Sequence, residues 1–153
     1  MTTIREYAQK VKQVRDGLLD EQERIVYSLE NEIIKMNVEK ITEGTGSDGN
    51  ILKNSSSIFK GVYTLSTQLI DPTKTAGNLY DFFKTGDFLK SFEVQVSNDL
   101  TKISIFSTGT GSGDKADFFN GYKNLYGLSK PDAYELNYNM ILPKLKQFIT
   151  KTL

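Results

Sequence analysis

The residues whose types and order are best suited to chemistry lie in FSTGTGSGDKADFF, from Phe106 to Phe119. A predicted β-strand leads through a glycine-rich loop to a predicted helix start. Backbone N–H groups in such a loop can bind an anion, because glycine lets the chain approach closely and a helix N-terminus adds positive potential. The segment therefore raises the question of a phosphate site and, with it, of an enzyme.

The phosphate-binding P-loop has the pattern G-x-x-x-x-G-K-[ST], in which the lysine reaches the phosphates and the hydroxyl binds magnesium. Counted from Gly109, Asp114 stands where the second glycine belongs, and Ala116 stands where the hydroxyl belongs. Lys115 alone matches, and the carboxylate of Asp114 would repel a phosphate. The sequence favours a connector in which Asp114 caps a helix that begins at Lys115.

The strand before this loop is predicted to belong to a hairpin, whereas the phosphate-binding templates need a parallel β-α-β unit. We expect no nucleotide and no other cofactor. A polar, glycine-rich loop on a scaffold is often a contact element instead. Gly109, Gly111 and Gly113 are therefore candidate partner-contact residues.

Three residue types are missing from the chain, which holds no Cys, no His and no Trp. Thiol catalysis, disulfides, imidazole or thiolate metal sites and histidine-based triads are excluded. The segment GTGSDGN resembles part of a calcium loop, but only Asp48 and Asn50 stand close together, so a turn is the better interpretation. We expect no catalytic set and no metal site.

The aromatic residues gather between residues 80 and 126. They could form a stacking platform for a sugar or a base, but packing in a core or an interface is the more frequent use. Nineteen basic residues balance nineteen acidic ones, so no overall field attracts nucleic acid or an anionic membrane. Neither sequence-specific nucleic-acid binding nor membrane binding is expected. The aromatic residues in question are Tyr80, Phe82, Phe83, Phe88, Phe92, Phe118, Phe119, Tyr122 and Tyr126.

The N-terminal segment predicts an amphipathic helix that ends near Asn37. Thr3 and Glu6 form a capping box, and apolar residues then recur at spacings of three and four. A bend or break is expected between Gly17 and Asp20, where glycine is unfavourable. The stripe before that break would be free to pack on another molecule, and its candidate contact residues are Tyr7, Val11 and Val14.

The later segments predict a small sheet and a closing helix. Phe92, Val94 and Val96 alternate with polar residues, and Ile103 and Ile105 do so after a turn at Asn98-Asp99, which indicates an antiparallel hairpin with one buried face. Weaker β-prone pieces are expected at residues 51–52 and 62–65, and a helical turn is expected after residues 85–87. A short helix is expected over residues 115–126, and a C-terminal helix opens at Ser129-Lys-Pro131-Asp132 and is kinked or restarted by Pro143.

This order of elements predicts one α+β domain over residues 1–153, with a long N-terminal helix, a small mainly antiparallel sheet and a C-terminal helix packed on it. The expected parts are a helical segment at 1–37, a β-rich region at 38–114 and C-terminal helices at 115–153. The N-terminus is charged where a signal peptide would be apolar, and no run of residues approaches the ~20 needed to span a bilayer.

Read as a series, the segments IIKMN, GTGSDGNIL, GVYTLST, KTGDFLKSFEV, KNLYGLS and ILPKL make this chain resemble small phage proteins of the virion-morphogenesis, tail-completion family. In that family an N-terminal helix leads into a sheet, a T-G-x-[LF] turn with a following Ser-aromatic pair feeds a hairpin, and a helix closes the chain. Thr85, Gly86, Phe88, Ser91 and Phe92 match that pattern.

The resemblance implies a non-enzymatic subunit that forms a ring of several copies at the head–tail junction or in the tail. Its implied partners are other copies of itself and neighbouring portal, connector or tail proteins. Its implied location is the virion, after synthesis in the host cytoplasm. Two alternatives stay open: a small nucleotide-handling enzyme that uses the Gly109 to Lys115 loop, and a binding module lined by the aromatic residues.

Overall fold

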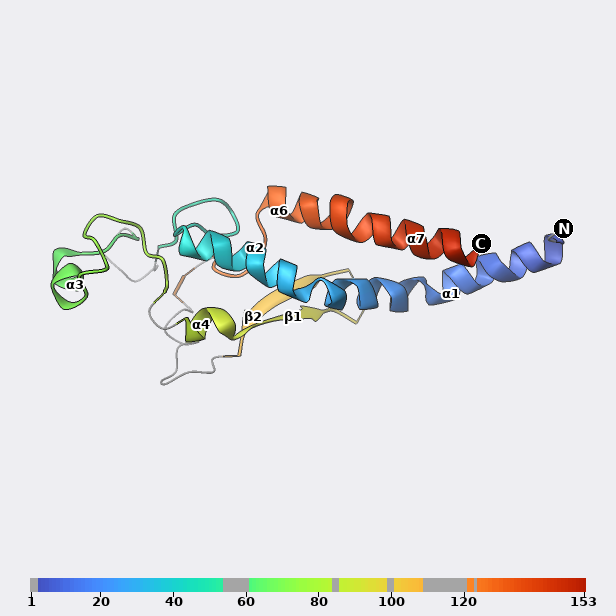
Figure 1. The fold of residues 1–153 in the computed structure, drawn as a ribbon, viewed down its shortest axis with the longest axis horizontal. Helices are drawn as coiled ribbons and strands as arrows, with labels where there is room; N and C mark the ends of the chain where they lie inside the picture. The colour runs from blue at the N-terminus through green and yellow to red at the C-terminus, as the bar shows by residue number, and fades with distance from the viewer. Residues whose placement is uncertain (1–2, 54–60, 84–85, 99–100, 109–120, 123) are drawn as a thin grey trace.

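The computed structural model describes residues 3–53, 61–83, 86–98, 101–108, 121–122 and 124–153. The described chain is elongated (Figure 1). Helices α1 (Ile4–Ser28) and α2 (Glu30–Thr42) run nearly end to end as a spine. The C-terminal helical segment lies along one side of this spine and a β-hairpin along the other, so the fold is α+β.

Helix α1 begins as the sequence predicts. The Oγ1 atom of Thr3 accepts a hydrogen bond from the N–H of Glu6 at 3.2 Å, and a carboxylate oxygen of Glu6 accepts one from the N–H of Thr3 at 2.7 Å. These bonds satisfy backbone donors that a helix start leaves free.

Of the bend or break predicted between Gly17 and Asp20, the break is wrong, because the helix continues through these residues. A single glycine costs a helix only about 1 kcal/mol relative to alanine, which packing against a neighbouring helix offsets. The interruption lies at Leu29, whose φ of −107° and ψ of 11° separate α1 from α2. Helix α2 also runs past the predicted end at Asn37 and stops at Thr42.

The predicted hairpin is confirmed. Strands β1 (Phe92–Val96) and β2 (Ile103–Ser107) pair antiparallel, and Val94 lies opposite Ile105. Residues of β1 are buried and exposed in strict alternation, and the buried face packs against the spine. A helical turn, α4 (Asp87–Lys90), precedes β1 as expected. Asp99 of the predicted turn lies outside the described residues.

Much of the region from residue 38 to residue 98 is less β-rich than predicted. Ile51 and Val62 form only isolated bridges, to Thr45 and Leu79. The side chain of Thr64 accepts a hydrogen bond from the N–H of Thr67, which starts helix α3 (Leu65–Ile70) at the end of the β-prone piece expected at residues 62–65. The helix cap ends that piece at Thr64.

The C-terminal helical segment opens at Ser129, whose side chain accepts a hydrogen bond from the N–H of Asp132, as predicted. It runs through α6 (Lys130–Tyr134), the π-helix η1 (Glu135–Ile141) and α7 (Leu142–Thr152). Pro143 stands in the first turn of α7, where its missing N–H is tolerated. The expected helix over residues 115–126 is not seen at 121–122 and 124–126, and its remaining residues lie outside the described parts.

The core follows the spine. Its largest fully buried side chains include Ile33 and Ile41 of α2, Leu52 and Leu125. Asn37 is the buried polar residue among them, and its side-chain amide donates to the carbonyl oxygens of Leu125 and Gly127, both at 3.1 Å. These two bonds fix the segment before α6 onto α2.

The register of the hairpin can be tested with Val94→Asp. Val94 is buried against the spine, and an unpaired buried carboxylate costs several kcal/mol against a typical stability of about 5–15 kcal/mol. We expect loss of the cooperative thermal transition measured by circular dichroism. Gln95→Asp places the same group on the exposed face and should unfold within a few degrees of the wild type. Equal melting of the two variants would contradict the assigned faces.

Candidate functional site

Large apolar side chains are exposed at both ends of the described chain. At one end, Ile4, Tyr7 and Val11 of α1 are 91%, 52% and 45% exposed. At the other end, Leu65, Leu69 and Ile70 of α3 are 73%, 85% and 86% exposed. Scattered exposed apolar residues need no explanation, but groups of them often mark a binding surface.

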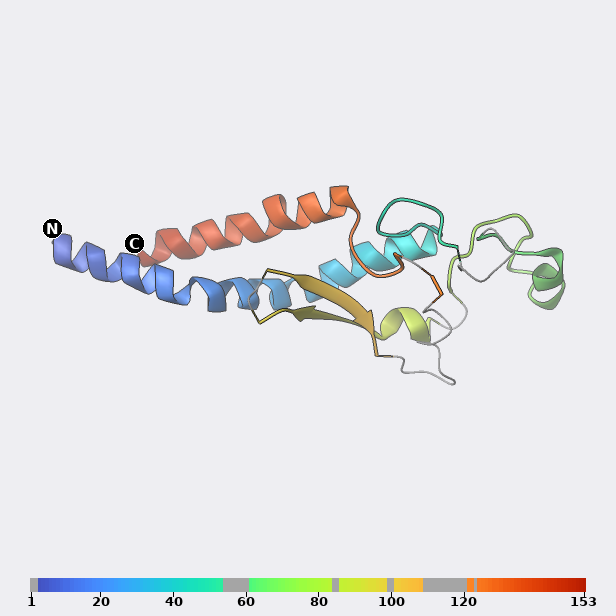
Figure 2. The ribbon, with the colours of Figure 1, turned by 180° about the vertical axis from the view of Figure 1, so that it is seen from behind.

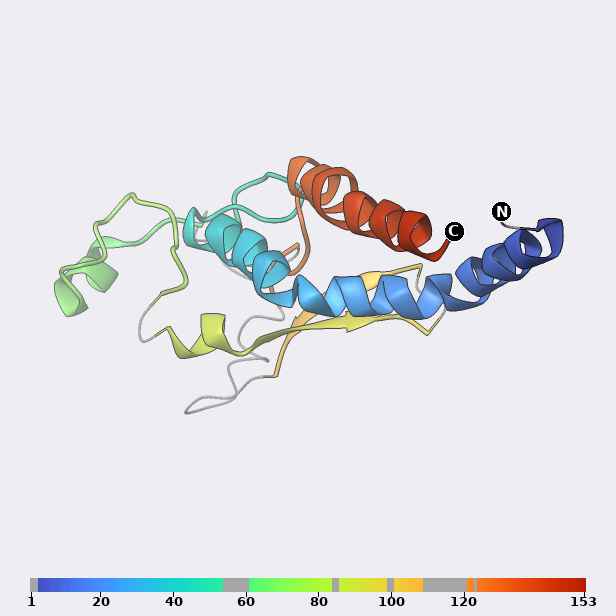
Figure 3. The same ribbon diagram turned by 45° about the vertical axis from the view of Figure 1, so that its right-hand side comes forward.

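The first end is a two-helix arm formed by the start of α1 and by α7. The two helices lie side by side, and the first turns of α1 extend past the end of α7 (Figure 3). The Lys10 ammonium group donates to the carbonyl oxygen of Leu153 at 2.6 Å. A Cβ atom at Gly17 would lie 3.5 Å from the ring of Phe148, so the helices approach closely there.

The predicted contact residues of α1 differ in how far their side chains are exposed to solvent. Val14 is half-buried, whereas Tyr7 and Val11 are exposed. No residue of α7 is fully buried. The helix therefore packs with one side against α1 and leaves the rest of its surface exposed to solvent. The other predicted contact residues, Gly109, Gly111 and Gly113, lie outside the described residues, as do Asp114 and Lys115.

The second end is the α3 lobe, which we define as residues 61–83. It lies beyond the end of α2 (Figure 2). A hydrogen-bonded cluster fixes it: the carboxylate of Asp81 accepts from Lys74 Nζ at 2.7 Å, from the Tyr63 hydroxyl at 2.8 Å and from the N–H of Phe83 at 2.9 Å. The cluster holds α3 on a defined loop and leaves its apolar side chains in solvent.

The charges in this cluster stabilise one another. Burial acts to raise the pKa of Asp81, but the hydrogen bonds from Lys74, from Phe83 and from Tyr63 outweigh it, and the pKa is lowered. Burial, together with the hydrogen bond to Asp81, raises the pKa of Tyr63 to about 12. Each shift favours the protonation state that the hydrogen bonds need at neutral pH, which fits a structural role.

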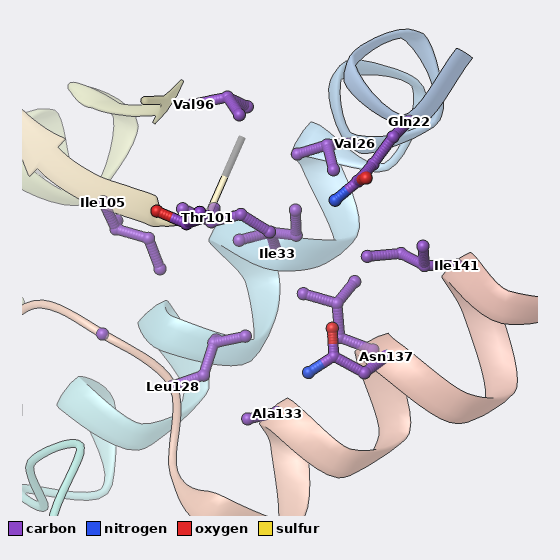
Figure 4. Close-up of a pocket in the computed structure, with 13 residues that line it drawn as sticks. Gln22, Val26, Ile33, Val96, Thr101, Ile105, Leu128, Ala133, Asn137 and Ile141 are labelled. Atoms are coloured by element: carbon purple, nitrogen blue, oxygen red, sulfur yellow. The ribbon is translucent and has the colours of Figure 1, made fainter. Parts of the chain in front are cut away.

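Between the two ends lies a groove with a volume of about 350 Å³ (Figure 4). It is bounded by the junction of α1 and α2, by the hairpin and by α6 with η1. Val26 and Ile33 line it from the spine, and Leu136 and Ile141 line it from η1. The remaining lining residues are Gln22, Val96, Thr101, Ile103, Ile105, Gly127, Leu128, Ala133 and Asn137.

The groove exists because two layers share the same spine. β1 and the C-terminal helical segment both pack on α1 or α2, and the space between the hairpin and η1 stays open. Among the residues that the structure describes, strand β2 pairs with β1 in a two-stranded sheet. The backbone of Val94 on the outer side of β1 donates to the Glu30 carboxylate at 3.2 Å, whereas Ile103 and Ile105 of β2 border the groove.

Other predicted sites fall into structural roles. The carboxylate of Asp48 accepts hydrogen bonds from the N–H and the side-chain amide of Asn50 and from the side-chain amide of Asn124. The bonds to Asn50 form the turn that the sequence predicts. The residues that the structure describes hold no group of three or more acidic, histidine or cysteine side chains able to bind a metal ion. Among the helices of the described ranges, none is both long and apolar enough to cross a bilayer.

Sequence reasoning missed the α3 lobe and the groove. The segment LSTQLI after Thr64 carried the signal for α3, because a capping threonine precedes apolar residues spaced by four and one. The groove has no such signal, since its residues come from separate helices, strands and a loop spread between Gln22 and Ile141. Comparison with known proteins adds no assignment: no protein-family model, curated protein or solved structure matches this chain.

The cluster in the α3 lobe predicts a pH dependence. Because the pKa of Tyr63 is about 12 in the folded chain and 10 in the reference state, the unfolded state loses its proton first. The free energy of unfolding should therefore fall between pH 10 and pH 12, and Tyr63→Phe should flatten that fall. Denaturant titrations at several pH values measure it. Tyr138→Phe, at an exposed ring, is the control and should keep the wild-type slope.

Proposed function

We propose that this protein is a non-enzymatic structural subunit of a phage particle, of the tail-completion or neck kind, which assembles into a ring at the head–tail junction or in the tail. The resemblance of its segment order to the virion-morphogenesis family supports this assignment. The observation that carries the proposal is that the most exposed apolar side chains, Ile4 at one end and Leu69 and Ile70 at the other, lie at opposite ends of an elongated chain, although others such as Tyr134 and Tyr138 are exposed between them.

An elongated subunit with a binding surface at each end can touch two neighbours at once. Tyr7 and Val11 lie on the arm, and Leu69 lies in α3, which is at the other end of the described chain (Figure 1). Removing such side chains from water in a contact between molecules is favourable by roughly 25 cal/mol per Å² of apolar surface. A contact at each end would therefore remove the exposed apolar surface of both ends from water. A zero net charge removes long-range repulsion between copies.

The arm is suited to contact with another protein because it is peripheral to the core. The buried residues of the spine begin at Ile25, well after Val11. Changes in the first turns of α1 therefore act on a surface rather than on the folding core. In this proposal the arm binds a neighbouring portal, connector or tail protein, and the virion is where the protein acts.

The first test replaces an exposed apolar residue of the arm. Val11→Glu should leave the thermal unfolding transition within a few degrees of the wild type, since Val11 lies outside the core. It should reduce the amount of the protein in purified particles at least tenfold, measured by quantitative mass spectrometry. Gln13→Glu adds the same single negative charge at a neighbouring exposed polar position of α1 and is the matched control. Normal incorporation of Val11→Glu would contradict the role of the arm.

The second test addresses the enzyme alternative. Asp114 and Ala116 occupy the two diagnostic positions of the P-loop pattern, so we expect no change in melting temperature on addition of millimolar ATP or GTP with magnesium. Saturable micromolar binding that disappears in Lys115→Ala would favour the nucleotide-handling enzyme over the structural subunit.

A further inference from the structure

Charge is distributed unevenly along this chain, although its net charge is zero. The arm consists of residues 4–19 of α1 together with α7. It holds seven of the nineteen basic residues and two of the nineteen acidic ones, a net charge of +5. The rest of the chain, with twelve basic and seventeen acidic residues, has a net charge of −5. The basic residues of the arm are Arg5, Lys10, Lys12, Arg15, Lys144, Lys146 and Lys151.

The two acidic residues of the arm are already engaged within α1. The Glu6 carboxylate accepts a backbone N–H in the capping box at 2.7 Å, and Asp16 pairs with Arg15 at 2.7 Å. In the parts of the chain that the structure describes, no ion pair includes Arg5, Lys12 or a lysine of α7. These five basic side chains are exposed. The arm therefore presents positive charge to any molecule that approaches it.

Exposed apolar side chains stand among these charges. Ile4 is 91% exposed and follows the chain next to Arg5. Val11 is 45% exposed and stands between Lys10 and Lys12. A partner that covers such a surface removes water from its charges, which is costly unless the partner supplies carboxylates. The same partner must therefore accept apolar side chains and compensate positive charge.

Nucleic acid and lipid fit this surface less well than protein does. A phosphate backbone offers negative charge but no apolar site for Ile4. A lipid surface takes up the apolar face of a helix, but part of that face of α1 is already covered, since Val14 and Leu18 are half-buried. A protein interface combines an apolar centre with a polar rim, so it can satisfy both requirements.

We propose that the arm binds an acidic protein surface that carries an apolar patch. Carboxylates of the partner pair with the lysines of α7 and with Arg5 and Lys12 of α1, while Ile4 and Val11 enter the apolar patch. The inference rests on the proposed function, in which the arm binds a neighbouring protein, and it names the chemistry that the neighbour presents. Opposite charge on the two surfaces also speeds their encounter and disfavours basic partners.

The acidic side chains in the rest of the chain are a poorer match for the arm. Several are held in bonds within the chain: Glu30 accepts the N–H of Val94, and Asp81 accepts from Lys74. The exposed apolar side chains of α3 stand on a helix that carries no acidic residue. The partner is therefore a different protein rather than a second copy.

The experiment measures binding of the full-length protein to a labelled synthetic helix of about five turns, with leucine along one face and glutamate over the rest. Fluorescence anisotropy should show saturable binding of this glutamate helix in about 0.1 M NaCl, where the screening length is about 10 Å. The same helix with lysine in place of glutamate should bind about tenfold more weakly or worse. Raising NaCl to about 1 M shortens the screening length to about 3 Å and should weaken binding of the glutamate helix by a similar factor.

Variants test the charged and the apolar parts of the arm separately. Lys144→Glu combined with Lys151→Glu reverses two exposed charges of α7 and should weaken binding about tenfold or more. Lys35→Glu combined with Lys53→Glu makes the same change of charge at exposed positions outside the arm and should keep the wild-type affinity. Ile4→Ser removes apolar area alone, so it should weaken binding by the same factor at low and at high salt. All variants should keep the wild-type circular dichroism spectrum.

Four outcomes would overturn the inference: no binding of the glutamate helix, equal binding of the lysine helix, unchanged affinity in the α7 variant, or tighter binding to duplex DNA or to phosphatidylserine vesicles. Self-association of the wild type at low salt that disappears in the α7 variant would overturn it as well, because the acidic surface would then belong to a second copy.

Incorporation into particles separates this inference from the proposed function. A protein that binds the glutamate helix but is absent from purified particles would remove the proposed function and leave the charge preference of the arm. Unchanged incorporation of the α7 variant would leave the proposed function and remove the acidic partner.

Discussion

The apolar stripe along α1 and α2, from Ile25 to Ile41, is the constraint on which the rest of the structure depends. A two-stranded hairpin is only marginally stable by itself in water, and it needs a surface on which to bury one face. The C-terminal helical segment has the same need. Both elements bury their apolar faces against the same pair of helices, where Ile33 is fully buried. Helices α1 and α2 therefore lie between the hairpin and the C-terminal helical segment and contribute to both packing interfaces.

Because both elements pack on the same two helices, their attachment points determine where the structure is closely packed and where the groove lies. Asn37 holds the chain segment before α6 against α2 through its bonds to Leu125 and Gly127, and Glu30 holds the outer side of β1 through Val94. Between these two fixed points, the hairpin and η1 do not close on each other. The groove is therefore a consequence of how the two elements are attached, and its lining combines core side chains such as Ile33 and Leu136 with the amides of Gln22 and Asn137.

The two ends of the chain differ in chemistry in a way that fits different partners. The arm mixes apolar residues with charges, as in many contacts between unlike proteins, whose rims are polar. Helix α3 carries no charged side chain, so the two ends of the described chain present different surfaces to solvent.

The sequence by itself determined the local features. The capping box at Thr3, the helix start at Ser129, the alternation that pairs Val94 with Ile105 and the α+β class all follow from residue types at fixed short spacings, which depend on hydrogen bonds and periodicity within a few residues. The long N-terminal helix, the hairpin and the closing helical segment follow in their order, whereas α3 does not, and the lack of histidine and cysteine side chains excludes their chemistry.

Only the tertiary structure decided the long-range features. The helix break moved from Gly17 to Leu29 because Gly17 packs against Phe148, about 130 positions away, and this packing outweighs the weak helix preference of glycine. The groove depends on residues from Gln22 to Ile141, and exposure of α3 depends on the Lys74–Asp81 cluster. Such features are set by which surfaces remain uncovered after packing, and that is a property of the whole chain rather than of any spacing within it.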